Sequence, residues 1–410
     1  MENNKIDNII LSGGWGYGNL GDDAILEATV ELLYERFPNA IIHILTYNIN
    51  ESKSVISNKS RCKFYRSLDL CLFGYNYHPT PIGKNKIVEL KTAIRKRLYA
   101  KHKIHKEEKL ISEILNNPGM FIENNMVELE EFMSLCNSAN MYFMAGGGYI
   151  NDWMQSVVSK YLEVKIAKDN NIYCYIGGIT FGPFNGRIQL SKLAHNMLSL
   201  CNGVFFRDFD SIIEAGDSCD WTYKEIVPDV ALSKKIIGRH MNTIVLIPFN
   251  RELEGNIYNI CRNVVDIAKS KKLDVILTVS QLWYNPMEIV LKLYYVIRSM
   301  GCSVKVIIPD DYRHLQEILS HASIVISQNL HGLIMAYRSG TKIVCLNDKR
   351  KFVSFMKMIY GAEYLFTPQN IEQTTISTLL DSDYSIKGNI DKFTFEINKA
   401  WDYIFDSPKI

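Results

Sequence analysis

GGWGYGNLGDDAIL, residues 13–26, is a glycine-rich stretch that follows a short apolar run and leads into an apparent helix. The apolar run at residues 7–12 predicts a β-strand, and residues 22–36 predict an α-helix. Gly16, Gly18 and Gly21 have the spacing of a dinucleotide-binding turn, in which glycines let a strand bend tightly into a helix. The stretch therefore predicts that the chain opens with the strand–loop–helix unit of an α/β fold.

The same stretch argues against a nicotinamide or flavin cofactor. The next predicted strand, AIIHILTYNIN, has no acid at its end, where a dinucleotide fold needs one to hold the ribose. Asp22 and Asp23 occupy the first helical turn, where they suit the helix dipole but would repel a pyrophosphate. Two interpretations of the glycines stay open and are compatible: a tight turn at a crowded cleft with Asp22 as helix cap, or a backbone that faces a substrate.

Short apolar runs alternate with longer helical patterns along the chain, which predicts parallel sheets covered by helices on both faces. The pattern breaks at residues 228–241, so we expect two Rossmann-like domains facing a cleft, residues 1–235 and 236–410, with the last helix packing back on the first domain. Ligands of such sheets bind beyond the carboxyl ends of the strands. The predicted strands are 7–12, 41–46, 141–145, 172–176, 203–207, 243–248, 275–279, 303–308, 323–327 and 342–346, and the clearest later helices are 152–169, 253–271 and 286–300.

Residues 61–131 break the alternation and are treated as an insertion in the first domain. An aromatic sequence, FYRSLDLCLFGYNYHPTPIG, is followed by the lysine- and arginine-rich segment 84–109. This segment is either a solvated surface helix or a basic amphipathic patch that contacts anionic lipid headgroups or a lipid diphosphate.

Composition excludes several classes of protein. A net charge of +2 over 410 residues gives no electrostatic reason to expect a nucleic-acid partner. No apolar run has the length of a membrane span, and the polar N-terminus does not resemble a secretory signal. The nine cysteines form no CxxC pair, so we expect reduced thiols in a cytoplasmic protein, with no disulfide framework, zinc site or other metal-ligand cluster.

Six motifs, the opening glycine-rich stretch among them, occur in a recognisable order between residue 9 and about residue 350. One of them, AGGG at 145–148, is predicted to end a strand and open a helix. The motifs and their order along the chain resemble those of the polysaccharide pyruvyl transferase family. The motifs are GYGNLGDDAIL (16–26), AGGG (145–148), IGGITFGP (176–183), RD (207–208), PDVAL (228–232) and SQNLHG (327–332).

The resemblance implies two Rossmann-like domains arranged as in GT-B glycosyltransferases. It also implies transfer of the enolpyruvyl unit of phosphoenolpyruvate onto two sugar hydroxyls, which forms a cyclic ketal and releases phosphate. Phosphoenolpyruvate is then a co-substrate, and no cofactor is implied. The acceptor would be a sugar in a lipid-linked or nucleotide-linked precursor of a surface polysaccharide such as an exopolysaccharide or capsule. The expected location is the cytoplasm, with peripheral contact at the inner face of the membrane left open.

His331 is the predicted general acid, because it follows strand 323–327 and begins a helix, and because a histidine side chain ordinarily titrates near neutral pH. Arg207 ends a strand at the expected cleft edge, where a guanidinium can pair with carboxylate or phosphate. The structural alternatives are a packed histidine and an ion pair of Arg207 with Asp208 or a neighbour. The other predicted donor-binding residues are Asn329, Leu330, Lys349 and Arg350, and the predicted cleft loops contain Gly16, Gly18, Asn19, Gly21, Asp22, Gly146, Gly147, Gly148, Gly177 and Gly178.

The chain departs from the family pattern at Asn329, where the family usually has an arginine. Asparagine can hydrogen-bond an anion but supplies no charge. The loss of the charge is expected to weaken donor binding by roughly 1.5–3 kcal/mol. Residues that could restore the charge are Arg251, Arg338, Lys349 and Arg350. The departure motivates two rival functions: a GT-B-like glycosyltransferase or related transferase with another donor, and a non-catalytic carbohydrate-binding scaffold protein.

Overall fold

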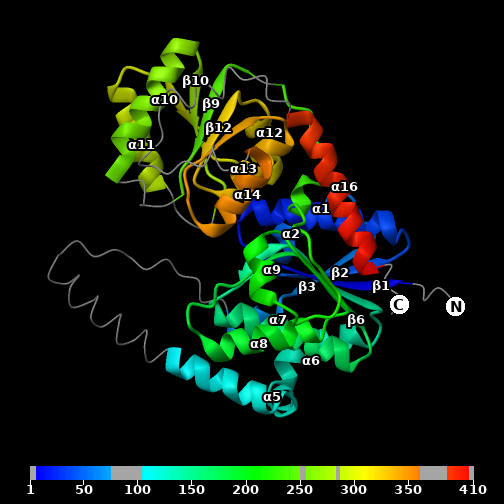
Figure 1. The fold of residues 1–410 in the computed structure, drawn as a ribbon. Helices are drawn as coiled ribbons and strands as arrows, with labels where there is room; N and C mark the ends of the chain where they lie inside the picture. Colours follow the sequence, from blue (N-terminus) through cyan, green and yellow to red (C-terminus); the bar gives the residue numbers. More distant parts are fainter. Residues whose placement is uncertain are drawn as a thin grey trace.

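The computed structural model describes residues 6–74, 104–239, 241–249, 255–282, 287–360 and 386–405. Two sheets organise them (Figure 1): an N-terminal sheet in the order β3-β2-β1-β4-β6-β7-β8, with β5 beside β6, and a C-terminal sheet in the order β11-β10-β9-β12-β13. All pairings between these strands are parallel. The predicted α/β fold with two parallel sheets is confirmed.

All ten predicted strands are present, and three more were not predicted: β3, β5 and β8. The strand β3 lies within the segment treated as an insertion, yet it forms the edge of the N-terminal sheet. The basic segment 84–109 falls mostly outside the described residues. The strands are β1 (Asn8–Ser12), β2 (Ile41–Thr46), β3 (Cys62–Arg66), β4 (Met141–Met144), β5 (Gly147–Ile150), β6 (Tyr173–Phe181), β7 (Gly203–Phe206), β8 (Thr222–Tyr223), β9 (Thr243–Ile247), β10 (Asp274–Leu277), β11 (Val304–Val306), β12 (Ile324–Ser327) and β13 (Lys342–Cys345).

The AGGG motif does not open a helix as expected; it begins the strand β5. Gly147 has φ 151°, which lets the chain change direction directly after β4. Strand β5 then pairs with the second half of β6, which runs on for nine residues through an irregularity near Gly177. The helix expected at residues 152–169 starts at Met154.

Helices cover both faces of each sheet, as the alternation of strands and helices predicts. In the N-terminal domain α6, α7 and α8 lie on one face and α1, α2 and α16 on the other; in the C-terminal domain α10 and α11 lie opposite α12 and α13 (Figure 1). The helices are α1 (Leu20–Arg36), α2 (Ile49–Val55), α3 (Leu68–Phe73), α5 (Pro118–Asn124), α6 (Met126–Cys136), α7 (Met154–Asp169), α8 (Ile188–Ser199), α9 (Phe209–Ala215), the 3₁₀ turn η1 (Val230–Leu232), α10 (Ile257–Lys271), α11 (Met287–Ser299), α12 (Tyr312–Ser320), α13 (Leu330–Arg338), α14 (Arg350–Tyr360) and α16 (Ile386–Phe405).

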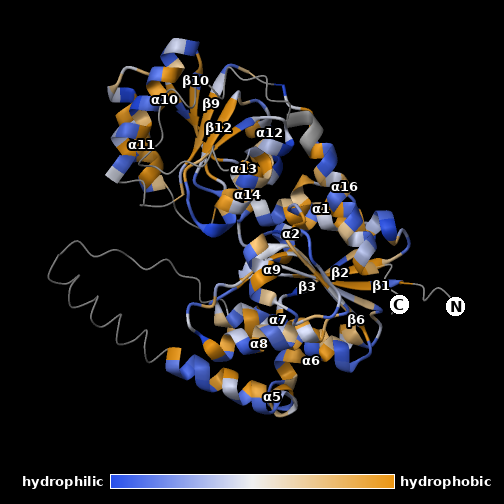
Figure 2. Cartoon of the chain, in the orientation of Figure 1, coloured by the Kyte–Doolittle hydropathy of each residue, from blue (hydrophilic) through white to orange (hydrophobic). Residues whose placement is uncertain are grey.

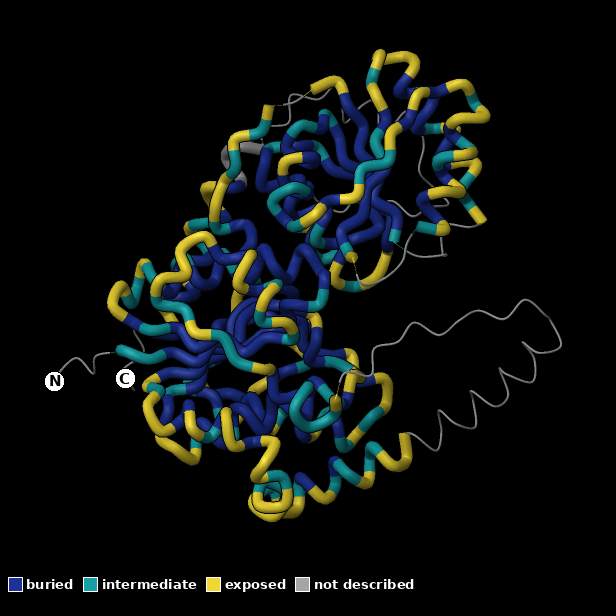
Figure 3. Tube along the Cα trace, turned by 180° about the vertical axis from the view of Figure 1, so that it is seen from behind, coloured by how far each residue is buried: buried dark blue, intermediate teal, exposed yellow. Residues whose placement is uncertain are grey.

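The central strands are apolar and buried, the edge strand β3 has no buried residue, and the helices carry the polar surface (Figures 2 and 3). Successive residues of β1 enter different hydrophobic clusters: Ile9 and Leu11 pack with α1 and α16, and Ile10 packs with α6, α7 and α8. The cluster that holds Ile9 continues into the C-terminal domain, so the two domains share a core. Of the described helices, none combines the length and the apolar character that a bilayer crossing requires.

Helix α16, near the end of the chain, packs against β7, β8 and η1 of the N-terminal half. The Trp401 ring lies 4.9 Å from Phe143, and the Phe405 ring lies 5.0 Å from Tyr175. Arg36 at the end of α1 pairs with Asp402 at 2.7 Å. The last described helix therefore ties the second half of the chain back to the first sheet.

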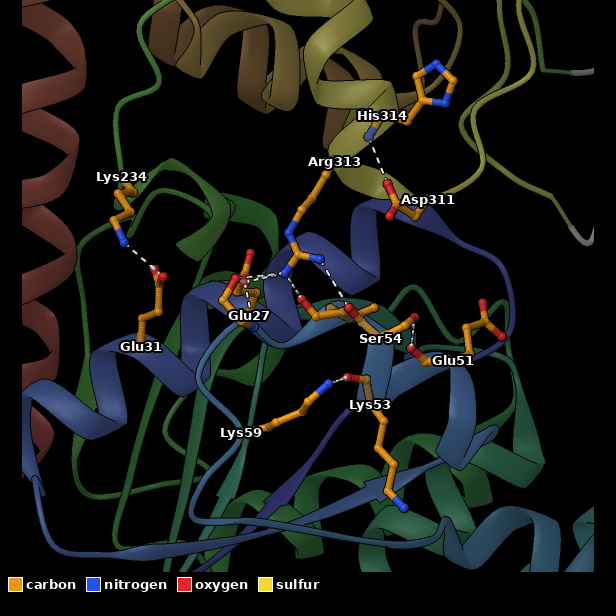
Figure 4. Close-up of polar contacts among 12 residues, drawn as sticks. Glu27, Glu31, Glu51, Lys53, Ser54, Lys59, Lys234, Asp311, Arg313 and His314 are labelled. Carbon is orange, nitrogen blue, oxygen red and sulfur yellow. Dashed lines mark hydrogen bonds and ion pairs between the residues drawn. The ribbon is translucent and has the colours of Figure 1, made fainter.

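Arg313 of α12 anchors the C-terminal domain to the N-terminal one (Figure 4). Its Nη2 donates to Glu27 Oε1 at 2.7 Å and its Nη1 to the Ser54 carbonyl at 3.1 Å, and it also contacts the Val55 carbonyl. Ser54 and Val55 end α2, where the carbonyls lack helical partners and attract a cation. A second pair, Lys234–Glu31 at 2.8 Å, reaches the same helix α1 from the linker.

We expect Arg313→Ala to lower the free energy of unfolding by about 1 kcal/mol, because the side chain is 40% exposed and water screens part of its interaction. The matched control is Lys234→Ala, which removes a more exposed cation from α1 and should cost less than about 0.5 kcal/mol. Urea denaturation measures both. Equal effects of the two substitutions would show that Arg313 does not act as an anchor.

Candidate active site

The glycine loop between β1 and α1 needs glycine at two positions. Gly16 and Gly18 have φ 80° and 76°, and a Cβ on Gly16 would lie 2.4 Å from Thr46 Oγ1. The Gly18 amide donates to Glu51 Oε1 at 2.7 Å, and its carbonyl accepts from the Leu282 amide at 2.7 Å. The loop is therefore held between α2 of its own domain and the segment after β10 of the other.

Asp22 is not the cap of α1, as one interpretation of the sequence had it; Asn19 occupies the N-cap position. The Asp22 carboxyl is buried, and its Oδ2 accepts hydrogen bonds from the Tyr17 hydroxyl at 2.5 Å and from Asn19 Nδ2 at 2.6 Å. Burial raises the pKa of Asp22 to about 7, against the lowering effects of the Tyr17 hydrogen bond and Arg207. The first turn of α1 thus presents a carboxyl that titrates near neutral pH.

His331 lies against that first turn, although it belongs to the other domain. A Cβ on Gly21 would come within 1.9 Å of His331 Cγ, so only glycine leaves room for the ring. His331 Nε2 is 3.7 Å from Asp22 Oδ1, and this buried nitrogen has no hydrogen-bond partner among the described residues. Burial lowers the pKa of His331 to about 3, with Asp229 acting in the opposite direction.

Gly21→Ala is expected to lower the free energy of unfolding by about 1–3 kcal/mol and to displace His331, because the new methyl overlaps the imidazole. The control is Gly255→Ala, where a Cβ meets nothing within 4 Å and the change should stay within about 0.5 kcal/mol. Urea denaturation measures the first effect. A Gly21→Ala protein as stable as the control would refute the contact.

Arg207 follows β7 and is buried, with its guanidinium shared between two partners. Its Nη1 pairs with Asp229 Oδ2 at 2.7 Å and its Nε donates to Thr180 Oγ1 at 2.9 Å. The partner of Arg207 is therefore Asp229 rather than Asp208. A Cβ on Gly148 would lie 3.3 Å from Arg207 Nη2, so that glycine gives the third nitrogen of the guanidinium space.

The remaining predicted glycines have packing roles. A Cβ on Gly146 would approach the Gly178 carbonyl at 3.0 Å, and one on Gly177 would meet the Phe205 ring at 2.6 Å. Gly178 has φ 71°. These glycines let β4, β5 and β6 approach one another behind Arg207.

Asn329 caps α13, its side-chain oxygen accepting from the Gly332 amide at 3.2 Å. An arginine at this position could not make that cap, since it has no acceptor. Of the residues considered as substitutes for the missing charge, Arg338 bonds to Gln316 and to the Ala231 carbonyl, and Arg251 lies outside the described residues. The structure therefore assigns the Asn329 oxygen to the helix terminus.

The two cations predicted after the last strand are placed differently. Arg350 joins the domains, with Nη2 3.1 Å from Asp208 Oδ1 and Nε 2.9 Å from Asp210 Oδ2. Lys349 is exposed at the start of the same segment, and its amide donates to Asn347 Oδ1. Lys351, the residue after Arg350, lines a cavity with Arg207 and Asp229.

Lys351, Asp229 and Tyr17 were given no role from the sequence. The spacing of Lys351, Phe355 and Met358, which share one face of α14 and line the cavity, was the available signal for the lysine. Lys351 is an exposed residue, but protein atoms crowd around its ammonium group. This desolvation lowers the pKa of Lys351, and the charge of Arg207 lowers it further. Asp229 belongs to the PDVAL motif, and the sequence alone assigns it no function.

The cavity is small, about 20 Å³, and its lining combines charged residues with apolar ones from α13 and α14. That volume holds about one water molecule. A ligand with several polar groups therefore requires the side chains around it, or the domains, to move apart. The lining residues are Arg207, Asp208, Asp229, Leu330, Ile334, Lys351, Phe355 and Met358.

The site thus joins a buried carboxyl, an imidazole nitrogen with no hydrogen-bond partner in the described part of the chain, and a cluster of cations, at the carboxyl ends of strands from two domains. Within the described ranges no group of three or more histidine, cysteine, aspartate or glutamate side chains could hold a metal ion. This arrangement can bind an anion and move a proton next to it. Together with the fold it defines the class: a two-domain, GT-B-like α/β protein with a polar site between the domains.

The family follows from comparison with known proteins. The family model of the polysaccharide pyruvyl transferases matches residues 19–350, and the chain belongs to this family. No curated protein matches the chain.

Solved structures match in fold. They include the S. aureus MnaA–UDP complex (12% identity, 97% of this chain and 96% of that one, TM-score 0.53) and a putative UDP-N-acetylglucosamine 2-epimerase from Listeria monocytogenes (12% identity, 99% and 98%, TM-score 0.55). The UDP-GlcNAc 2-epimerase of Methanocaldococcus jannaschii also matches, with 10% identity over 97% and 99% of the chains and a TM-score of 0.54. These structural matches confirm the GT-B-like fold and show nothing beyond the fold.

Proposed function

We propose that this protein transfers the pyruvyl unit of phosphoenolpyruvate onto two hydroxyls of a sugar, forming a ketal and releasing phosphate. The observation that carries the proposal is the buried Nε2 of His331, which lies 3.7 Å from Asp22 and has no hydrogen-bond partner among the described residues, in a chain of the pyruvyl transferase family. The methylene carbon of phosphoenolpyruvate must gain a proton during the transfer. A histidine next to cationic side chains supplies this acid beside the donor's carboxylate and phosphate.

In this proposal His331 is the catalytic acid and Arg207 holds the donor with its Nη2. Leu330 lines the cavity, Lys349 and Arg350 add cations directly before the lining residue Lys351 in the chain, and the glycine loops give the substrates access to backbone groups. Asn329 contributes through its cap of α13, which fixes the helix start beside His331. The acceptor is a sugar of a surface-polysaccharide precursor, lipid-linked or nucleotide-linked, and the reaction takes place in the cytoplasm or at the inner membrane face.

The first experiment is thermal unfolding of the purified protein with phosphoenolpyruvate, UDP or nucleotide sugars, because it needs no acceptor. A ligand at 100 times its Kd adds about 2.7 kcal/mol, which raises the Tm by a few degrees. Phosphate release with a sugar acceptor and detection of the ketal by mass spectrometry then test the reaction. A Tm shift with phosphoenolpyruvate but no phosphate release with any of a panel of acceptors would contradict a transfer reaction.

A second candidate is a transferase with a nucleotide-sugar donor. The absence of the family's usual arginine at Asn329 favours it. A Tm shift with nucleotide sugars and none with phosphoenolpyruvate would give this candidate the lead. The non-catalytic scaffold alternative predicts instead that His331→Ala leaves polymer modification in cells intact.

A further inference from the structure

The carboxyl of Asp22 and the imidazole of His331 face each other across 3.7 Å, from different domains. Both hydrogen bonds that Asp22 accepts, from Tyr17 and Asn19, fall on Oδ2. Oδ1 is the oxygen turned toward His331, and Nε2 is the imidazole nitrogen turned toward Asp22. A hydrogen bond between them needs the gap to shorten by roughly 0.5–1 Å.

A buried imidazole nitrogen that faces a carboxyl oxygen of a buried residue is unfavourable unless a proton lies between them. A carboxylate and a neutral imidazole nitrogen are both acceptors, and burying two acceptors together costs free energy. One proton turns the pair into a donor and an acceptor. The geometry therefore favours a pair that holds one proton.

We propose that Asp22 and His331 share a single proton, and that Asp22 is the positioning residue that supplies this proton to Nε2 of His331 when an anionic donor binds. In that step the O–H bond of Asp22 breaks and an N–H bond to His331 Nε2 forms, so the proton count of the pair stays at one. The later transfer of the proton from His331 to the donor rests on the proposed function. The sharing of the proton by Asp22 and His331 does not.

The charges around the pair decide where the proton lies. Arg207 and Lys351 face it as cations, Asp229 as an anion, and Tyr17 and Asn19 as hydrogen-bond donors to Asp22. Burial raises the pKa of Asp22 to about 7 and lowers that of His331 to about 3, so without ligand the proton lies on the carboxyl. A bound anion favours the imidazolium and draws the proton to His331.

The pH dependence follows with a definite sign. The pair carries its proton below about pH 7 and loses it as the pH rises through that value. In Asp22→Asn the proton must sit on His331, whose pKa burial holds low, so the active form exists only at more acidic pH. We expect the alkaline limb of kcat/KM to move toward acid by at least about one pH unit, since that limb reports the acid of the free enzyme.

The deciding measurement needs no substrate: the ring nitrogens of His331 are titrated by NMR in the ligand-free protein, with the signal assigned by its loss in His331→Gln. The wild type should show a step near pH 7, and Asp22→Asn should show none between pH 6 and 8. Asp23→Asn is the matched control, because it makes the same change in the next buried carboxyl, which bonds the Gly16 amide instead. It should titrate as the wild type does.

An unchanged His331 step in Asp22→Asn would overturn the proposal. If that variant does not fold, the Asp22 carboxyl carbon is followed in the wild type, and no titration between pH 6 and 8 would equally refute it. Because these titrations use no donor, they stand even if the protein does not use phosphoenolpyruvate. If the titrations show a shared proton but no phosphate is released, the proposal of the shared proton holds and the proposed pyruvyl transfer is rejected.

Discussion

His331→Gln should lose about 10²–10⁴-fold in kcat while keeping most of its affinity for phosphoenolpyruvate. The glutamine fills part of the space of the imidazole but cannot give up a proton at neutral pH. The turnover is measured as phosphate release at saturating donor, and the affinity as the Tm shift with phosphoenolpyruvate. A kcat within threefold of the wild type would remove His331 from the catalytic role.

The control for this substitution is His314→Gln on α12 of the same domain. His314 is partly exposed, pairs with Asp310 and lies outside the residues that line the cavity. We expect its kcat to match that of the wild type. Equal losses in the two variants would point to a general disturbance of the C-terminal domain.

Arg207→Ala should lower the free energy of unfolding by about 3–5 kcal/mol and abolish the Tm shift with phosphoenolpyruvate. The side chains of Arg207 and Asp229 are 6% and 3% exposed, so removal of the cation leaves a buried carboxylate without its partner. Urea denaturation gives the stability, and thermal unfolding with the donor gives the binding.

A double variant separates these two effects. Arg207→Met with Asp229→Asn removes both charges and should recover most of the lost stability, since a neutral pair leaves no buried charge behind. The double variant should still fail to bind phosphoenolpyruvate. Restored donor binding in it would show that Arg207 acts only on the fold.

The sequence was sufficient for the parts of the molecule that depend on local pattern. Apolar runs of strand length and the glycines after β1 predicted the α/β class. Motif order then led to His331 and Arg207, which the structure brings near the same buried cluster. Both residues follow strand ends, where side chains from different strands converge.

What the sequence could not supply were pairings between distant residues. Nothing in the chain links Asp22 to His331 or Arg207 to Asp229, because each contact depends on how two elements pack. Lys160 and Glu163 show the same limit: on α7 they look like ordinary surface charges, yet they are almost fully buried and pair at 3.0 Å beside Ser12. Strand β3 was missed because its last three residues, Phe64 to Arg66, belong to the aromatic stretch that was treated as an insertion.

The antiparallel contact between the glycine loop and the segment after β10 consists of main-chain bonds, Leu282 N to Gly18 O at 2.7 Å and Leu20 N to Ser280 O at 3.2 Å. Main-chain groups are the same in every residue type except proline, so these two bonds depend on the number of residues between β10 and the contact and not on the side chains at 280–282. A one-residue deletion there should misplace the loop more than any single exchange of side chains. Selection for this main-chain contact would act on the length of the segment, and an alignment scored on residue identity would pass over it.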